Sequence, residues 1–308
     1  VVIMLIATVI GMTKVKNVFF PASTTPIFMV DIWMPEGTDI LGTETLVNRI
    51  EHDLLNTYDE HGIVNITSVI GQGAQRFALT YQPEKTYAAY AQLMIEMRDL
   101  ENLAQFLPWL EQHLRQAYPE AEYRVKKMEN GPSPAAKIEA RLYGDNPIIL
   151  RQLSEQVKDI FNQEPDADNI RSTWRNKQLI IRPQIDLARS REIGISKQDL
   201  DTALLRNFNG QQIGIYRDGS HQLPIIARSP ANERKNANSL NELQVWSSKY
   251  QDFAPITQLV SSFASEWEIP IIMRRDRKRV ITVLADPATH SHETADSLLK
   301  KVRYKVEA

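Results

Sequence analysis

Near the start of the chain, three stretches have the alternating or β-rich hydrophobic pattern of β-strands. They are Ile27–Met34, Ile63–Val69 and Arg76–Gln82, and each is bounded by Gly, Pro or polar turn residues. Between the first two, Thr43–Tyr58 repeats its apolar residues at the spacing of one helix face. The pattern therefore predicts a β-α-β unit followed by a further strand.

A longer helix is predicted over Tyr87–Ala117, with an interruption near Pro108, because proline disrupts the interior of a helix. Glu122–Met128 then has the pattern of another strand. The order from residue 27 to residue 128 is thus β-α-β-β-α-β. This order is typical of the ferredoxin-like, or split β-α-β, arrangement, in which two helices back an antiparallel sheet.

After Asn130–Pro134, which reads as a linker, the same order begins again and is interrupted part-way. The predicted elements are strand Lys137–Tyr143, helix Pro147–Asn162, strand Asn169–Trp174, strand Arg279–Ala285 and helix Glu293–Val302. We therefore expect an α+β protein with two ferredoxin-like subdomains, of which the second carries an insertion and lacks its final strand.

The interruption begins with a regular stretch, residues 185–219. A short charged helix ends at Gly194, and Ser196 caps a second helix that has Asp199 in its first turn. Asn209-Gly210 then leads into a predicted hairpin that starts near Gln211. No residue pattern in this stretch indicates catalysis.

Composition narrows the function classes. The chain has 308 residues, of which 43% are hydrophobic and 24% charged, and its net charge is −2. These values are typical of folded domains and give no overall field for binding nucleic acid. The absence of cysteine excludes disulfides, thiolate catalysis and cysteine-based zinc sites, and suits either cytoplasm or periplasm.

The first residues, Val1–Met12, are almost wholly apolar and precede Lys14 and Lys16. A run of this length is shorter than the roughly 20 residues that cross a bilayer. It also lacks the features of a cleavable signal peptide. Either it is the outer end of a transmembrane helix, with the two lysines at the interface, or it is a buried N-terminal strand or helix.

No nucleophile elbow, metalloprotease motif, phosphate loop or dinucleotide fingerprint occurs in the chain. Gly71–Gly73 is expected to be a flexible loop between strands. In the following stretch Phe77, Leu79 and Tyr81 share one face of the predicted strand. This stripe predicts core packing, or alternatively a pocket wall beside a mobile glycine loop.

Two other polar clusters have simple structural explanations. His290 and His292, with Glu293, lack the further ligands that a metal site needs, and we expect them to be exposed near the start of a helix. Arg274–Arg279 lies between two β-rich stretches and is expected to form a charged hairpin connection rather than a nucleic-acid surface. We expect no metal and no cofactor.

Four segments, in order, resemble landmarks of one family, the resistance-nodulation-division (RND) efflux transporters of the acriflavine-resistance type. They are FFPASTTPIFMVDIWMPEGTD, NIRSTWRN, IDLARSREIGISKQDLDTALLRNFNGQQIG and MRRDRKRVITVLADP. The similarity spans essentially the whole chain. It identifies the second periplasmic loop of such a transporter.

The resemblance implies a division into parts. Residues 1–17 correspond to the end of a transmembrane helix, and 18–130 to the first porter subdomain of the loop. Residues 131–183 and 266–308 correspond to a truncated second porter subdomain, and 184–265 to an inserted docking domain that faces an outer-membrane channel. The function implied is export by a proton-driven multidrug antiporter of the bacterial inner membrane, with this region in the periplasm.

Family members are homotrimers that work with a periplasmic adaptor protein and an outer-membrane channel, and they move small amphiphilic substrates between porter subdomains. Matched by position, the substrate-binding residues implied are Phe28, Met29, Gly71, Gln72, Gly73, Phe77, Leu79, Ile138, Leu142 and Arg171. Gly71–Gly73 falls on the switch loop and Arg171 on the entrance cleft. The short loop lacks the phenylalanines of well-known drug pumps, which argues against an identical drug range.

Two other classes compete with a transporter. A soluble ligand-sensing or regulatory protein can also be built from paired ferredoxin-like units, although the apolar Val1–Met12 argues against it. An enzyme would need a convergent polar site, which the sequence does not contain. We therefore expect a transport protein region that performs no covalent chemistry and binds no nucleic acid.

Overall fold

The computed structural model describes residues 23–58, 62–78, 81–128, 135–234, 237–288, 291 and 293–307. Contacts divide the chain into two units, one made of residues up to Gln178 together with those from Ile269 on, the other of Leu179–Glu268. Several predictions lie outside the described residues: the transmembrane end at 1–17, the linker Asn130–Pro134, Leu79, and the histidines at 290 and 292. Within the described ranges, no helix has the length and apolar character needed to cross a membrane.

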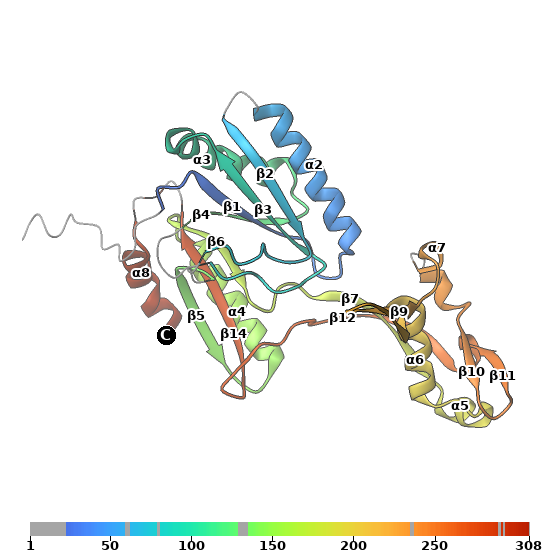
Figure 1. Ribbon diagram of the computed structural model, residues 1–308. Coiled ribbons are helices and arrows are strands. Elements are labelled where there is room, and N and C mark those ends of the chain that lie inside the picture. The colour runs from blue at the N-terminus through green and yellow to red at the C-terminus, as the bar shows by residue number, and fades with distance from the viewer. Residues whose placement is uncertain are drawn as a thin grey trace, which may run out of the picture. The chain divides into compact units, whose positions relative to one another are not determined.

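The first subdomain has the ferredoxin-like order (Figure 1). Its elements are β1 (Ile27–Trp33), α2 (Ile40–Tyr58), β2 (Ile63–Ile70), β3 (Tyr90–Met97), α3 (Leu100–Ala117) and β4 (Glu122–Lys127). The strands form an antiparallel sheet in the order β2-β3-β1-β4. The fold class predicted from the sequence is therefore confirmed for this subdomain.

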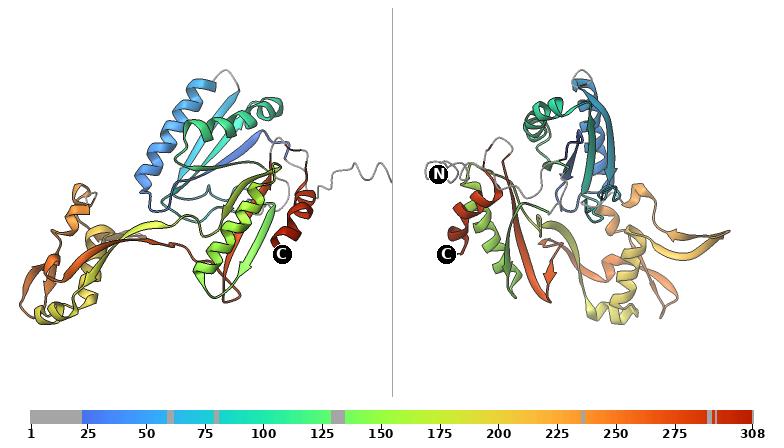
Figure 2. Two further views of the ribbon diagram at one scale, coloured as in Figure 1. Left: turned by 180° about the vertical axis from the view of Figure 1, so that it is seen from behind. Right: turned by 60° about the vertical axis from the view of Figure 1, so that its left-hand side comes forward.

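Alternation along β1 gives the sheet two different faces. Phe28, Val30 and Ile32 are fully buried against α2 and α3, where Phe28 meets Phe106 with ring centroids 6.0 Å apart. Both helices cover this face, as the two views of Figure 2 show. Successive strand residues point to opposite faces, so Met29, Asp31 and Trp33 lie on the face without helices. We call this second surface the open face.

The third strand was predicted in the wrong place. Arg76–Gln82 forms no strand where it is described, and β3 is Tyr90–Met97, which the sequence pattern assigned to a helix. Its Ala, Gln, Leu, Met and Glu residues favour helices in isolation. Between β1 and β2, however, both faces of the segment are buried, and this tertiary environment outweighs the local preference.

The interruption predicted at Pro108 is also wrong, because α3 continues through it to Ala117. Asp99 caps this helix by accepting a hydrogen bond of 2.8 Å from the backbone N–H of Asn102. Five apolar side chains on one face of α3, among them Leu110 and Leu114, are buried against the sheet. This packing holds the proline-containing helix in place.

The second subdomain repeats the pattern up to its second helix. It contains β5 (Ile138–Tyr143), α4 (Pro147–Asn162), β6 (Ala167–Ser172), β13 (Arg274–Arg275), β14 (Lys278–Pro287) and α8 (Ala295–Glu307). β14 pairs antiparallel with both β5 and β6, and α4 and α8 share one core with these strands. Asn146 caps α4, and Pro147 occupies its first turn.

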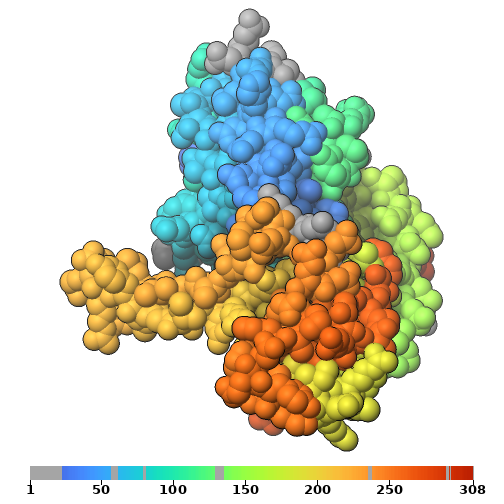
Figure 3. All heavy atoms as spheres, turned by 90° about the vertical axis from the view of Figure 1, so that its right-hand side faces the viewer, coloured from blue at the N-terminus to red at the C-terminus, as the bar shows by residue number. Residues whose placement is uncertain are grey.

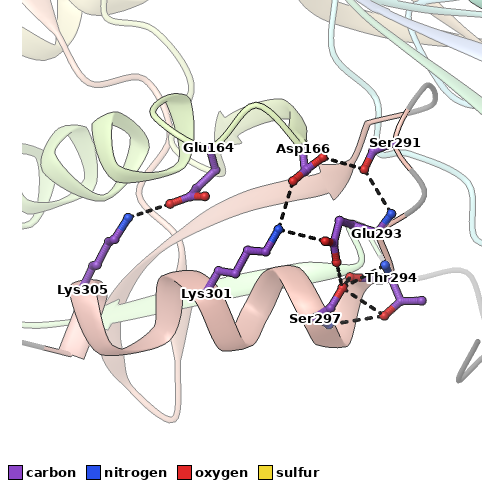
Figure 4. Close-up of polar contacts among 8 residues, drawn as sticks. All are labelled: Glu164, Asp166, Ser291, Glu293, Thr294, Ser297, Lys301 and Lys305. Atoms are coloured by element: carbon purple, nitrogen blue, oxygen red, sulfur yellow. Dashed lines mark hydrogen bonds and ion pairs between the residues drawn. The ribbon is translucent and has the colours of Figure 1, made fainter. Parts of the chain in front are cut away.

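Helix α8 is joined to the α4–β6 turn by a chain of charged contacts (Figure 4). Lys301 Nζ lies 3.1 Å from Asp166 and 2.9 Å from Glu293, and Lys305 Nζ lies 2.6 Å from Glu164. The helix begins two residues later than predicted and runs to Glu307. These contacts orient α8 beside α4.

The charged run Arg274–Arg279 forms the hairpin connection that the sequence predicted. β13 pairs with the start of β14, and the residues between them, Asp276 and Arg277, both have positive φ, 51° and 65°. A two-residue turn with positive φ at both positions matches the twist of the flanking strands. The charges therefore lie in a tight turn at the end of the sheet.

The second unit has its own core. Its elements are β7 (Gln178–Ile185), α5 (Leu187–Ile193), α6 (Lys197–Phe208), β8 (Gln211–Asp218), β9 (His221–Ala227), α7 (Ala231–Arg234), η2 (Ala237–Leu240), β10 (Gln244–Ser247), β11 (Asp252–Pro255), η3 (Ile256–Gln258) and β12 (Val260–Glu268). β7 pairs with β12, β8 with β9 and β10 with β11. The core gathers residues of α6, β10, β11, η3 and β12, including Leu200, Val245 and Ile256.

The helix signals in the opening part of this unit are confirmed. Gly194 ends α5 in the left-handed conformation, at φ 75°. Ser196 and Asp199 form a reciprocal capping box, in which each accepts a hydrogen bond from the other's backbone N–H. The hairpin of β8 and β9 projects from the rest of the unit (Figure 3) and exposes apolar side chains such as Ile213 and Leu223.

Leu110→Ala is expected to lower the free energy of unfolding by about 2–5 kcal/mol, because Leu110 is 0% exposed and its loss leaves a cavity. Leu100→Ala, in the same helix at a side chain 43% exposed, is the control and should change stability by less than about 1 kcal/mol. Urea unfolding measures both. Equal losses would contradict the assigned faces of α3.

Ser196→Ala should destabilise α6 by about 1 kcal/mol, because the N-terminal N–H groups lose their acceptor. Hydrogen exchange of the α6 amides reports this local change. Thr202→Ala, which removes a hydroxyl from an exposed position within the same helix, should not increase exchange. Faster exchange in both variants would show that the capping box is not the cause.

Candidate functional site

Asp31 lies at the centre of the open face of the first sheet, where it is buried and paired. Its carboxylate lies 2.8 Å from Lys126 Nζ and accepts hydrogen bonds from the Tyr90 hydroxyl at 2.9 Å and Gln92 Nε2 at 2.7 Å. These partners come from β3 and β4, the strands on either side of β1. An acidic residue in an apolar strand is thus stabilised by its neighbours across the sheet.

Opposing effects determine the pKa of Asp31. Burial alone would raise it, but the nearby Lys126 charge and the hydrogen bonds from Lys126 and Gln92 outweigh burial, so the pKa is lowered. Burial and the same carboxylate raise the pKa of Tyr90, which keeps its proton for the hydrogen bond. The network is therefore an ionised pair with a neutral phenol.

Part of the open face is covered by the segment between β2 and β3. Gln92 Oε1 accepts hydrogen bonds from the Ala74 backbone N–H at 3.0 Å and the Tyr81 hydroxyl at 2.7 Å. Ala74 and Tyr81 pack with Met29 beneath them. Phe77 stacks on Tyr81 with centroids 4.9 Å apart and is 45% exposed. One glutamine thus connects the covering segment to the sheet.

Ion pairs connect the two subdomains, both of which belong to the first unit. The guanidinium of Arg124, on β4, donates two hydrogen bonds to Asp286 on β14, at 2.9 and 3.2 Å, and both side chains are buried. Arg115 pairs with Asp168 at 2.7 Å nearer the surface. The two hydrogen bonds between Arg124 and Asp286 fix the orientation of the side chains as well as their distance.

Trp33 sits where these contacts meet, and it is only 7% exposed. The guanidinium carbons of Arg171 and Arg175 lie 5.3 and 5.5 Å from its ring centroid, within the range of cation–π attraction. Arg175 also pairs with Glu36. Arg171 donates hydrogen bonds to the carbonyls of Asn169 and Ala135, and burial lowers its pKa to about 10.

Two cavities open on either side of these residues. One, of about 290 Å³, which we call the tyrosine cavity, includes Asp31, Tyr81, Tyr87, Lys126, Arg175, Ile271, Met273 and Leu284 in its lining. The other, of about 450 Å³, which we call the turn cavity, lies by the α3–β4 and α4–β6 turns. Trp33, Arg124 and Arg171 line both cavities. Each hollow draws on both subdomains, so together they form a cleft.

The structure places some of the predicted binding residues at this cleft and others elsewhere. Arg171 lines both cavities. Met29 lies beneath the covering segment, and Gln72 is exposed at its start. Gly73 sits close against Glu84, because a β-carbon at that position would lie 2.5 Å from the Glu84 nitrogen. Gly71, at φ 83°, makes the turn after β2.

Phe28, Ile138 and Leu142 belong to the cores that face the helices. In this conformation Phe28 and Ile138 are buried there, and Leu142 is only partly exposed. The substrate-binding roles of these three residues stay predictions. Phe77 is accessible, but it lies in an irregular segment rather than on the predicted strand.

The cleft also contains residues that sequence reasoning missed: Asp31, Trp33, Arg124, Arg175 and Asp286. One signal was available for the first two. Asp31 and Trp33 fall on the same face of β1 by alternation, and a carboxylate amid apolar strand residues requires a buried partner. The pairing of Arg124 with Asp286, 162 positions apart, carried no local signal. Within the described residues, no three His, Cys, Asp or Glu side chains gather as a metal site.

Asp31→Asn should destabilise the first subdomain by about 3–5 kcal/mol, because Lys126 is left without its buried partner. Because folding lowers the Asp31 pKa, its contribution is present above the unfolded value, about 3.9, and is lost as pH falls through the folded pKa. Urea unfolding from pH 7 downward should show a shallower loss of stability in acid for the variant. Parallel curves would contradict this role.

Comparison with known proteins gives the family. No curated protein matches the chain. The structure is similar to two crystal forms of a heavy metal efflux pump, with TM-scores of 0.75 and 0.76 and 12% sequence identity to each. Each match covers 99% of this chain but only 32% and 31% of the pump, so the chain spans about a third of these proteins. A family model, described as the AcrB/AcrD/AcrF family, matches residues 1–307, and the chain therefore belongs to this family of RND efflux transporters.

Proposed function

We propose that this chain is the periplasmic substrate-handling and docking region of a proton-driven RND efflux pump in a bacterial inner membrane. The observation that carries the proposal is the cleft between the two subdomains. One wall is the open face of the first sheet. The other is the face of the second sheet that turns away from its helices, because Leu284 and Asp286 alternate along β14 with Val283 and Ala285 of the helix-facing core. Buried arginines and Trp33 lie between the two walls. Membership of the family supports the same role. The chain would bind and guide substrates without covalent chemistry or a cofactor.

The mechanism we propose is alternating access. Relative movement of the subdomains would open and close the cleft, and a substrate shifts this balance only by binding one state better than the other. The Arg124–Asp286 and Arg115–Asp168 pairs span the two subdomains, so their contacts would change when the cleft opens. Discrete ion pairs of this kind suit a switch between two packed arrangements.

The proposed substrates are small amphiphilic organic molecules. The similar solved structures are described as heavy metal pumps. In this cleft, however, Asp31 and Asp286 already accept contacts from Lys126 and Arg124, so neither carboxylate is available to a metal ion without breaking a buried pair. An organic molecule with aromatic and aliphatic surface fits the tyrosine cavity better than a metal ion does.

We further propose that the second unit docks against other components of the pump. The hairpin β8–β9 exposes apolar side chains over its length, which is unusual for a surface that meets only water. A homotrimer with a periplasmic adaptor and an outer-membrane channel is the assembly we expect, as the family resemblance implies. The soluble sensor considered from the sequence is disfavoured, because the family match extends over residues 1–307.

Crosslinking the cleft in the full-length transporter tests the proposal. Arg115→Cys with Asp168→Cys places thiols at an ion pair between the subdomains. The chain contains no cysteine, so the pair can be modified selectively once any cysteine elsewhere in the transporter is replaced. A reducible bifunctional thiol reagent should lower the export rate of a fluorescent dye to less than about a tenth, and reductant should restore it.

The matched control is Arg49→Cys with Glu120→Cys, an ion pair of 2.8 Å within the first subdomain. Crosslinking this pair should leave export unchanged, because no movement between subdomains is blocked. Undiminished export from the transporter crosslinked at positions 115 and 168 would sink the proposal that the cleft must move.

A further inference from the structure

Among the described residues, Arg171 at the centre of the cleft has no carboxylate closer than 4.0 Å. Lys126 pairs with Asp31 and Arg175 with Glu36, but Arg124 and Arg171 share Asp286. The Asp286 carboxylate accepts both hydrogen bonds from Arg124 and a third, of 2.9 Å, from the Lys137 backbone N–H. Arg171 Nη1 lies 4.0 Å from it. Arg124 therefore holds Asp286 by two hydrogen bonds, whereas Arg171 meets the same carboxylate only at longer range.

The hydrogen bonds of Arg171 are made to neutral groups, the backbone carbonyls of Asn169 and Ala135. Among the described residues, the carboxylate within ion-pair distance of it is Asp286. A guanidinium has five N–H donors, so two hydrogen bonds leave donors for a ligand. The side chain is only 14% exposed, and a buried charge without a close counter-ion is costly unless an anion joins it.

Aromatic and aliphatic side chains lie beside Arg171. The guanidiniums of Arg171 and Arg175 lie over the ring of Trp33. The adjoining tyrosine cavity is lined by Tyr87, Ile271 and Met273, among others. Because Arg124, Arg171 and Trp33 line both cavities, a ligand in either one reaches the same charge. The linings also contain charges of both signs, with Glu84 and Lys85 in the tyrosine cavity and Glu122 in the turn cavity.

We propose that the cleft selects aromatic organic anions: a flat apolar body lies along Trp33, and a sulfonate or carboxylate group binds Arg171 beside Arg124. This inference names the substrate class of the cleft and so rests on the proposed function. Charge-assisted hydrogen bonds to a guanidinium are strong and directional, which gives the anionic group its selectivity. Asp286 holds Arg124 in place but leaves Arg171 for the ligand.

A matched pair of fluorescent probes tests the selection. Anilinonaphthalene sulfonate and phenylnaphthylamine share one aromatic skeleton, and only the first carries an anionic group. Binding of each is measured on the purified full-length transporter, and export of each is measured in cells. Arg171→Gln should weaken sulfonate binding by about tenfold or more and amine binding by less than about twofold. Arg171→Lys, which keeps the charge without the planar fork, should fall between.

Arg141→Gln is the control, because Arg141 lies exposed on β5 and pairs with Glu139, outside both cavity linings. Arg141→Gln should change neither the binding nor the export of either probe. Equal weakening of both probes by Arg171→Gln would overturn charge selection, as would no change in either or a wild-type transporter that binds neither. The crosslinking experiment does not depend on these probes, so a moving cleft with no anion preference would leave the proposed function intact.

Discussion

The buried contact between Arg124 and Asp286 is the constraint on which the cleft depends. It joins β4 of one sheet to β14 of the other. The Asp286 carboxylate accepts hydrogen bonds from the Arg124 guanidinium and from the Lys137 backbone N–H. Removing two charges from water is costly, and the cost is recovered only when geometry and hydrogen bonding are good. The pair therefore specifies one relative placement of the two open faces more than it adds stability. Trp33, Arg171 and both cavities are positioned by that placement.

Each sheet supplies the cleft with the face that its helices leave uncovered. In the first subdomain this face carries a polar network that is almost fully satisfied, from Lys126 through Asp31 to Gln92. Gln92 extends the network to the covering segment, because its side-chain oxygen accepts hydrogen bonds from the Ala74 backbone N–H and the Tyr81 hydroxyl. Buried polar networks of this kind make a surface rigid, because each lost partner leaves an unsatisfied group. A rigid wall beside the loosely paired guanidinium of Arg171 is suited to discriminating ligands.

The second unit is stabilised by local helix caps and a small apolar core. Its core is small and apolar, its helices are fixed by caps at Ser196 and Gly194, and its hairpin exposes apolar residues. The local signals in its sequence are strong because caps and tight turns depend on neighbours in the chain. A scaffold specified locally can present an exposed apolar surface without lining the cleft. This separation agrees with the lack of catalytic motifs in residues 185–219.

The sequence by itself determined the order of elements in the two subdomains, the caps at Gly194 and Ser196, and the Arg274–Arg279 hairpin, since these depend on periodicity and on residues near one another in the chain. It failed at β3, where helix-forming residues become a central strand because both faces are buried. Only the tertiary structure decided the cleft. Arg124, Asp286 and Trp33 acquire their roles from contacts between distant segments, and no local pattern encodes a partner 162 positions away. Which distant charges pair depends on how the two sheets pack, so the ion pairs of the cleft form only when both sheets are in place.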